Sequence, residues 1–293
     1  MKSVFVAPDG VVEFEYTGDS HRAGGANDVP RGRRRYTIVD DDVELTLKAW
    51  EAFYGPKVDP RHRHNYDQIR FILEGEVQYG IKSYKAGTLA YFPESVHYGP
   101  KSSAKMGARV LTFQSPGPSG IPIFTLEDDR RGSQELRALG VQFIDGIAHF
   151  PDGKKQDGFE AVWEHLAGHK IEYPPARYND PIFMHTPTYE WRPTKRPGLS
   201  VKHLAYLNEG GPNVALLHIE PSASTEKGEL GCYQVRWVIE GEVELAGQRC
   251  PATSFFYYPP GVAYDAMESR TGATVLVIQG QPPAGEAPPL GVW

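Results

Sequence analysis

Short runs of alternating hydrophobic and polar residues dominate the chain, and turn-forming residues separate them. Val, Ile, Tyr and Phe are frequent within the runs, while Gly, Pro and Asn bound them, which is typical of antiparallel strands joined by hairpins. Helical spacing of apolar residues occurs mainly in the middle of the chain, over 133–139 and 157–166. The pattern predicts an all-β fold with a partly helical connector.

A sequence repeat divides the chain into two similar halves. Residues 68–77, QIRFILEGEV, align with residues 234–243, QVRWVIEGEV, at a constant offset of 166 residues. Each copy continues to an aromatic-proline turn, YFPESVHYG at 91–99 and YYPPGVAYDA at 257–266. Because a duplicated sequence folds into a duplicated unit, the repeat predicts two β-domains of one architecture.

The positions of the helical segments set the expected domain boundaries. We expect a first β-domain over residues 1–130, a helical connector over 131–175 and a second β-domain over 176–293. In a chain of 293 residues, each half is long enough to bury a hydrophobic core without disulfide or metal staples.

Composition and charge narrow the class of partner. The formal net charge of −6 argues against general affinity for nucleic acid or an anionic membrane, so we expect a small-molecule partner. No run approaches the roughly 18 consecutive apolar residues of a membrane span, and the first residues lack the apolar core of a signal peptide. We therefore expect a cytoplasmic protein in which Cys232 and Cys250, the only cysteines, stay as thiols.

Two segments of the first half resemble the two sequence motifs of the cupins. The segment from Gly55 to Gly75 is similar to the first motif, in which a histidine pair precedes a carboxylate and a closing glycine; here the pair is His62 and His64, and Gln68 stands at the carboxylate position.

The second cupin motif is similar to residues 87–97 and ends on His97. Its turn is expected to be one residue shorter than in the family, and Ser95 replaces a glycine. The resemblance implies a double-stranded β-helix, the jelly-roll barrel, in each half of the chain.

The resemblance also implies a metal ion inside the first barrel. His62, His64 and His97 are the expected ligands, and Gln68 is the candidate fourth. Three neutral imidazoles suit a divalent transition metal; we favour Fe(II), with Mn, Ni, Cu or Zn as alternatives, and the remaining open positions suit catalysis.

The second copy carries no comparable set of ligands. We match His62, His64 and His97 with Gly228, Leu230 and Tyr264 of the second copy, none of which is a good metal ligand, so we expect the second barrel to be metal-free. Gln234 and Arg236 nevertheless match the Gln-x-Arg of the first copy. A structural role for Gln-x-Arg in both barrels therefore stays open beside a ligand role for Gln68.

Arg70 and Tyr66 are the candidate catalytic residues. An inward guanidinium can bind the carboxylate, enolate or phenolate of a substrate, and the alternative is structural pairing with Glu74 or Glu76. The side chains of Tyr66, Tyr91 and Tyr98 either line the same barrel mouth or pack as ordinary aromatic residues.

The sequence is compatible with three kinds of function. The preferred one is a non-heme iron dioxygenase acting on a small anionic chelating substrate of phenolic, diketone or keto-acid type, because three-histidine cupins include such enzymes. A redox-neutral metal-dependent isomerase or lyase is the second, and a non-catalytic small-molecule-binding protein is the third. The aromatic run over residues 255–258 also suggests a homodimer.

Overall fold

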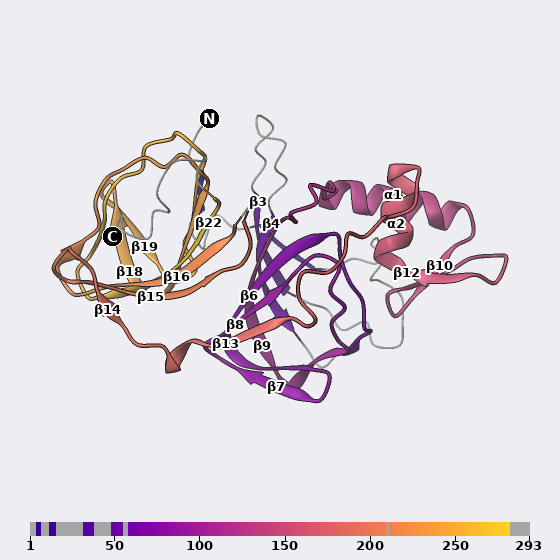
Figure 1. Ribbon diagram of the computed structural model, residues 1–293, viewed down its shortest axis with the longest axis horizontal. Helices are drawn as coiled ribbons and strands as arrows, with labels where there is room; N and C mark the ends of the chain where they lie inside the picture. The colour runs from indigo at the N-terminus through magenta and orange to yellow at the C-terminus, as the bar shows by residue number, and fades with distance from the viewer. Residues whose placement is uncertain are drawn as a thin grey trace. The chain divides into compact units, whose positions relative to one another are not determined.

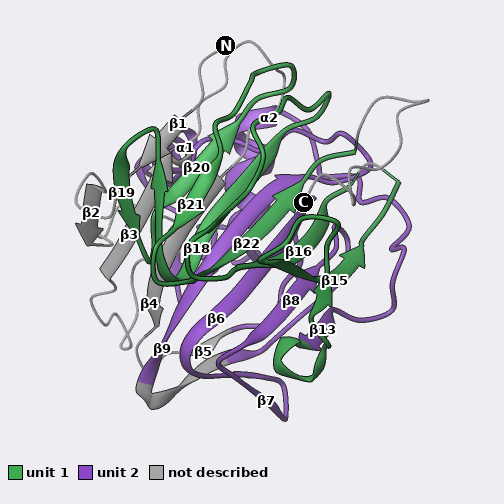
Figure 2. Ribbon diagram, turned by 90° about the vertical axis from the view of Figure 1, so that its left-hand side faces the viewer, with its two compact units in different colours: residues 1–11, 185–293 green, residues 12–184 purple. Residues whose placement is uncertain are grey.

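The computed structural model describes residues 60–209 and 211–281, although only the backbone is described for 102–106 and 126, and it adds the backbone of five strands within residues 4–59. Gly55, the first residue of the cupin-like motif, lies outside the described residues. The chain divides into two compact units, residues 12–184 and residues 1–11 with 185–293 (Figure 2). The expected connector, 131–175, lies within the first of these units.

The first barrel is a curled antiparallel sheet whose main path runs β13-β8-β6-β9-β4-β3-β2 (Figure 1). Strands β5 and β7 pair with β9 and β6 beside this path. The described strands are β2 (Val12–Glu15), β3 (Gly32–Thr37), β4 (Lys48–Tyr54), β5 (Val58–Asp59), β6 (Tyr66–Tyr79), β7 (Lys82–Lys85), β8 (Thr88–Phe92), β9 (Lys101–Pro116) and β13 (Ile182–His185).

The second barrel repeats this order as β1-β20-β18-β22-β16-β15-β14. In both sheets the edge beside β8 or β20 is completed by a strand from outside the repeat, β13 in one and β1 in the other. The strands are β1 (Val4–Val6), β14 (Arg192–Pro193), β15 (Leu199–Tyr206), β16 (Asn213–Ile219), β17 (Ala223–Ser224), β18 (Gln234–Leu245), β19 (Gln248–Pro251), β20 (Phe255–Tyr258), β21 (Met267–Ser269) and β22 (Ala273–Gln279).

The helical connector has its own small apolar core. Helix α1 (Leu126–Ala138) begins at a capping box between Thr125 and Asp128, which is why it starts before the predicted 133–139. Helix α2 (Gly158–Ala167) is capped by Asp157, and the two helices lie beside a three-stranded sheet (Figure 1). That sheet consists of β10 (Gln142–Ile144), β11 (Ile147–His149) and β12 (Lys155–Asp157); a short 3₁₀ helix follows later, η2 (Thr186–Thr188).

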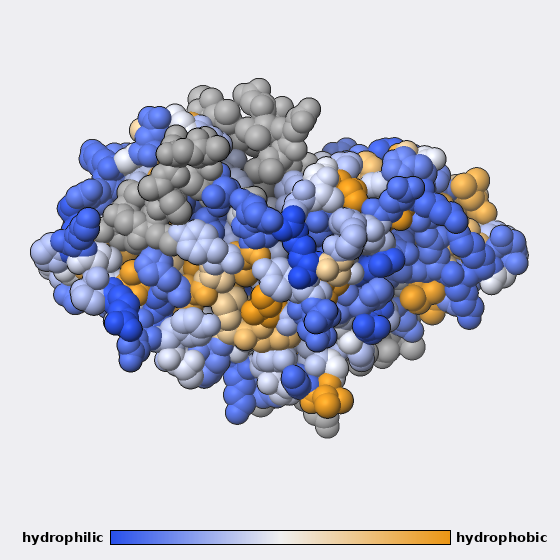
Figure 3. Space-filling view, in the orientation of Figure 1, coloured by the Kyte–Doolittle hydropathy of each residue, from blue (hydrophilic) through white to orange (hydrophobic). Residues whose placement is uncertain are grey.

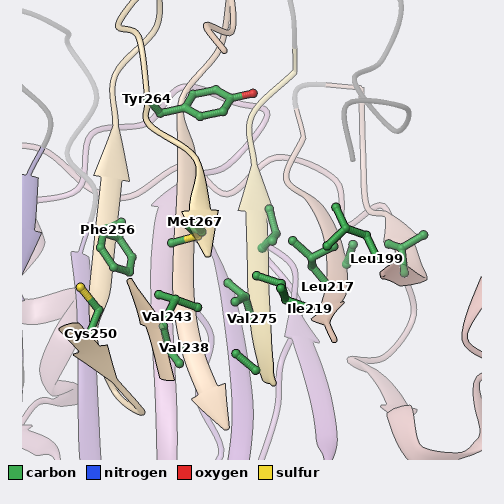
Figure 4. Close-up of a cluster of buried hydrophobic side chains, with 14 of the residues drawn as sticks. Leu199, Leu217, Ile219, Val238, Val243, Cys250, Phe256, Tyr264, Met267 and Val275 are labelled. Carbon is green, nitrogen blue, oxygen red and sulfur yellow. The ribbon is translucent and has the colours of Figure 1, made fainter. Parts of the chain in front are cut away.

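Alternation along the strands fills each barrel with apolar side chains. In the second barrel Val238, Phe256 and Val275 belong to one buried cluster (Figure 4). Hydrophilic residues cover most of the face shown in Figure 3. The aromatic run 255–258, which suggested a dimer interface, is buried in β20, so it offers no exposed surface for a partner.

Sterics explain why a glycine closes the motif in each copy of the repeat. Gly75 and Gly241 both adopt positive φ, 75° and 74°. A Cβ at Gly75 would overlap the carbonyl oxygen of Gly107, and one at Gly241 would overlap that of Gly272. The all-β prediction is confirmed, and the same local geometry recurs in both barrels.

Candidate functional site

Tyr98, not His97, faces His62 at one end of the first barrel, which we call the first-barrel mouth. His62 and Tyr98 form an isolated antiparallel bridge with N···O distances of 3.0 and 2.9 Å, and their ring centroids lie 4.4 Å apart. Gly228 and Tyr264 form the same bridge in the second barrel. Tyr98 is therefore the counterpart of Tyr264, and the expected match of His97 with Tyr264 is wrong by one residue.

The turn before Tyr98 is of full length, which explains the error. Ser95 adopts φ 67°, and its counterpart Gly261 adopts φ 69°. The serine thus takes the left-handed conformation that favours glycine, and the turn has the same length in both barrels. The prediction of a shortened turn is wrong.

His97 points away from the barrel interior. Its side chain is exposed, whereas those of its neighbours Val96 and Tyr98 are buried. Reduced hydration and the nearby charges of Arg63 and Arg61 lower the pKa of His97, and Glu160 opposes them. His97 therefore lies on the rim beside the charged side chains of Arg61, Arg63 and Glu160.

His62 and His64 lie side by side at the mouth, with ring centroids 4.9 Å apart. The Nδ1 atom of His62 is 2.7 Å from the carbonyl oxygen of Pro60, which can only accept, so Nδ1 carries the proton and Nε2 carries the lone pair. His64 is buried and stacks on Tyr66, with centroids 4.5 Å apart and planes at 9°. The structure therefore brings two of the three predicted histidines together.

Tyr66 and Tyr91 lie on opposite faces of the sheet. The hydroxyl of Tyr66 accepts a hydrogen bond from Gln114 Nε2 at 2.9 Å, beside the His64 ring. The hydroxyl of Tyr91 donates to Asp67 Oδ2 at 2.8 Å. Tyr66 thus lines the interior with the histidines, while Tyr91 and the buried carboxylate of Asp67 do not.

Arg70 is buried inside the first barrel against aromatic side chains. Its Nη1 donates to the hydroxyl of Tyr79 at 2.7 Å and its Nη2 to that of Tyr98 at 3.4 Å. The guanidinium carbon lies 4.6 Å from the ring centroid of Phe92. Glu74, an expected partner, pairs with Arg109 at 2.7 Å instead.

The two Gln-x-Arg pairs make different contacts. In the second barrel Arg236 Nε donates to Gln234 Oε1 at 2.6 Å, and Gln234 Nε2 donates to Gln279 Oε1 at 2.8 Å. In the first barrel Gln68 is equally buried, yet its Oε1 has no hydrogen-bond partner among the described residues. The structural role holds in the second barrel, and Gln68 keeps an unused acceptor.

A second unused polar atom lies next to Gln68 and Arg70. Thr112 stands directly opposite Arg70 in the register of β6 and β9, is fully buried, and has no described partner for Oγ1. A buried polar atom without a partner costs about 1–3 kcal/mol. Gln68 and Thr112 therefore mark a place where a bound molecule or water would complete the interior.

Helix α2 covers the mouth, which the sequence did not predict. The ring of Phe159 meets that of His64 edge-on at 4.5 Å. Glu160 Oε1 lies 3.6 Å from Arg63 Nε, and the Arg63 guanidinium lies 3.7 Å from the Tyr173 ring. Burial raises the pKa of Tyr173 well above its usual range. The connector thus shields His64 from solvent.

The predicted three-histidine donor set does not fit this interior. His97 is outside, Tyr98 takes its place, and the nearest carboxylate in sequence, Asp67, is on the other face of the sheet. Among the described residues no group of three or more His, Cys, Asp or Glu side chains is arranged to hold a metal ion.

The model of the ChrR cupin-like domain family matches residues 179–283, in the second half of the chain. A candidate dioxygenase from Nostoc punctiforme superposes with a TM-score of 0.66 at 16% identity, covering 98% of this chain and 85% of that one. Oxalate decarboxylase from Bacillus subtilis superposes with a TM-score of 0.57 at 14% identity, covering 95% of this chain and 76% of that one.

Curated relatives match a shorter segment. The ribosomal RNA small subunit methyltransferase C of Yersinia pestis is 26% identical over 109 residues, which are 37% of this chain. The match spans about a third of the methyltransferase, 31% of its length.

The superpositions show that the chain has the fold of these two proteins. Its second half is similar in sequence to the ChrR cupin-like domain. No helix in the described part of the chain combines the length and apolar character needed to cross a bilayer.

Proposed function

We propose that this protein is a cupin enzyme that binds a small organic anion inside the first barrel and moves a proton on it. The observation that carries the proposal is the buried group of Arg70, Tyr98, Gln68 and Thr112, in which the last two keep unused polar atoms. The superposition on two proteins named as enzyme or candidate enzyme supports it at the level of fold.

Charge at the mouth supports an anionic substrate. The guanidinium groups of Arg61 and Arg63 lie on the first-barrel rim near His97 and outnumber the one carboxylate beside them, that of Glu160. The matching positions of the second barrel are Lys227, Glu229 and Ala263. A positive rim attracts anions and raises their association rate.

His62 is the proposed base. Because its Nδ1–H donates to Pro60, its Nε2 lone pair can take a proton from a carbon next to the substrate carbonyl. The electron pair of the broken C–H bond moves to the carbonyl oxygen, where Arg70 and the hydroxyl of Tyr98 stabilise the negative charge. The imidazolium then returns the proton to another atom of the substrate, so the reaction is redox-neutral.

His64 and Tyr66 position the substrate rather than react with it. Their stacked rings, with Phe159 against the edge, form a rigid aromatic wall beside the base. A closed wall also keeps bulk water from the enolate.

Iron-dependent oxygenation is the second candidate. Donation of His62 Nδ1–H to a backbone carbonyl is an arrangement common among metal-binding histidines, and the superposed Nostoc punctiforme protein is named as a candidate dioxygenase. The exposed His97 weakens this candidate because only two imidazoles remain.

Exchange of substrate C–H hydrogens for deuterium distinguishes the redox-neutral proton transfer from iron-dependent oxygenation. The full chain, treated with a chelator and kept anaerobic in D₂O, is incubated with pyruvate, 2-oxobutanoate and acetylacetone, and deuterium incorporation is followed by NMR. We expect exchange above the buffer rate with the wild type, none above it with His62→Gln, and a raised KM with Arg70→Lys. Exchange that His62→Gln leaves intact overturns the proposal, as does turnover that requires both ferrous iron and dioxygen.

A further inference from the structure

A row of polar side chains crosses the interior of the second barrel. Asn213, Gln279, Gln234 and Tyr258 stand directly opposite one another on the neighbouring strands β16, β22, β18 and β20. By alternation they share the inward face with the apolar cluster that contains Ala215 and Val277, among others. Figure 4 shows that apolar cluster along the strands, with Tyr264 at one end.

Two residues of this polar row hydrogen-bond to each other, and the other two have polar side-chain atoms without a hydrogen-bond partner among the described residues. Gln234 and Gln279 hydrogen-bond to each other at 2.8 Å. Asn213 and Tyr258 are each only 4% exposed, and neither the Nδ2 and Oδ1 atoms of Asn213 nor the hydroxyl of Tyr258 has a partner among the described residues. Buried donors and acceptors are normally paired, so these three atoms point to a molecule that binds inside the second barrel.

Arg236 places a positive charge beside the row. Its guanidinium carbon lies 5.2 Å from the Tyr258 ring and 4.3 Å from the Tyr264 ring. Burial lowers the pKa of Arg236, because the charged form loses hydration inside the barrel. A bound anion would offset this cost, and a guanidinium presents a fork that matches a carboxylate.

A hollow opens at the Tyr264 end of this barrel. It has a volume of about 430 Å³ and is lined by Lys227, Gly228, Glu229, Ala263, Tyr264 and Asp265. Gly228 stands where the first barrel has His62, and a Cβ there would come within 2.5 Å of the Tyr264 hydroxyl. The missing side chain thus makes room for Tyr264, which borders the hollow on one side and contacts Arg236 on the other.

We propose that the second barrel binds a small 2-hydroxy carboxylate at this polar row. The carboxylate pairs with Arg236 and accepts a hydrogen bond from Tyr258, while the hydroxyl of the ligand exchanges hydrogen bonds with the amide of Asn213. The ligand enters from the hollow past Tyr264. Unlike the first-barrel proposal, this one involves no reaction and is independent of the activity proposed above.

The test compares lactate with propionate, which lacks only the hydroxyl. Binding to the full chain is measured by saturation-transfer NMR and by titration calorimetry, for the wild type, Asn213→Leu, Tyr258→Phe and, as a control in the other barrel, Arg70→Lys. We expect lactate to bind more tightly than propionate and Asn213→Leu to remove that difference. Tyr258→Phe should weaken the binding of both acids by about ten- to a hundredfold, the size of one charge-assisted hydrogen bond.

Two outcomes would overturn the proposal. In the first, neither acid binds the wild type; a rise in the melting temperature of Asn213→Leu would then show that the row holds structural water only. Alternatively, Arg70→Lys abolishes lactate binding while Asn213→Leu and Tyr258→Phe leave it unchanged, which would locate the ligand in the first barrel. Because Asn213→Leu and Tyr258→Phe alter different strands, failure of one variant to fold leaves the other as the test.

Discussion

Tyr98 bridges His62 through two backbone hydrogen bonds, and its side chain, not that of His97, enters the first barrel. The relationship decides the donor set at the mouth, since a phenol occupies the place where the sequence predicted an imidazole. It also makes the two barrels alike, because Tyr264 bridges Gly228 in the same way.

Exchanging this phenol for an imidazole should create a metal site. Tyr98→His adds a third inward histidine to His62 and His64, so we expect the affinity for Co²⁺ to rise by more than about tenfold, or roughly 1.4 kcal/mol. His97→Ala should leave the affinity unchanged. Titration followed by the visible spectrum of Co²⁺ measures both, and a loss of Co²⁺ binding in His97→Ala would show that His97 enters the barrel.

Arg70 should depend more on Tyr79 than on Tyr98 for stability. Its bond to Tyr79 is 2.7 Å long, whereas that to Tyr98 is 3.4 Å and correspondingly weak. Tyr79→Phe should therefore lower the free energy of unfolding by about 1.5–3 kcal/mol, and Tyr98→Phe by clearly less. Urea unfolding of the two variants checks the order, and equal losses would contradict it.

Gly75, the closing glycine of the first repeat, should not tolerate substitution, for two separate reasons. Gly75→Ala must accept positive φ and also displace the Gly107 carbonyl, while Gly80→Ala, at φ 60°, meets no atom within 4 Å. We expect Gly80→Ala to cost about 1–2 kcal/mol and Gly75→Ala to cost about 1–3 kcal/mol more. Urea unfolding separates the two, and similar costs would mean that the backbone near Gly107 shifts freely.

Helix α2 should control access to His64. Phe159→Ala removes the ring that covers the imidazole edge, so diethyl pyrocarbonate should modify His64 severalfold faster than in the wild type. Phe150→Ala is the matched control, because it removes another half-buried phenylalanine from the connector's own apolar cluster. Mass spectrometry of the modified peptide reads the rate. Equal rates in the two variants would contradict a covering role for Phe159.

The sequence was sufficient to predict the barrels but not the site. The repeat aligned Gln68 with Gln234 and Arg70 with Arg236, and these pairs occupy equivalent positions on β6 and β18. The wrong placement of His97 in the barrel interior came from the turn before it. Ser95 adopts the positive φ that favours glycine, and a serine in the sequence does not predict that conformation. Because the turn is one residue longer than assumed, the alternation of side chains shifts by one residue, so that Tyr98 points inward and His97 outward.

Contacts between distant segments were also beyond the sequence. Phe159 reaches His64 because α2 packs across the mouth, and no periodicity within either segment contains that information. The divergence of the two Gln-x-Arg pairs has the same cause, since it depends on which partner each arginine meets: Tyr79 for Arg70, and Gln234 for Arg236.

Tyr258 should make the protein sensitive to alkali. Burial raises the pKa of Tyr258 from its usual 10.0 to about 12, so the folded chain keeps a proton that the unfolded chain releases. The contribution is fully present below pH 10 and is lost as the pH rises from there toward 12, at about 1.4 kcal/mol per pH unit. Tyr258→Phe removes the titrating group, so its free energy of unfolding should fall less steeply over this interval. Tyr189→Phe, which removes a partly exposed hydroxyl from the same unit, is the control. Urea unfolding at several pH values measures how steeply the free energy of unfolding falls with pH. Equal slopes for Tyr258→Phe and the wild type would mean that folding does not raise the pKa of Tyr258.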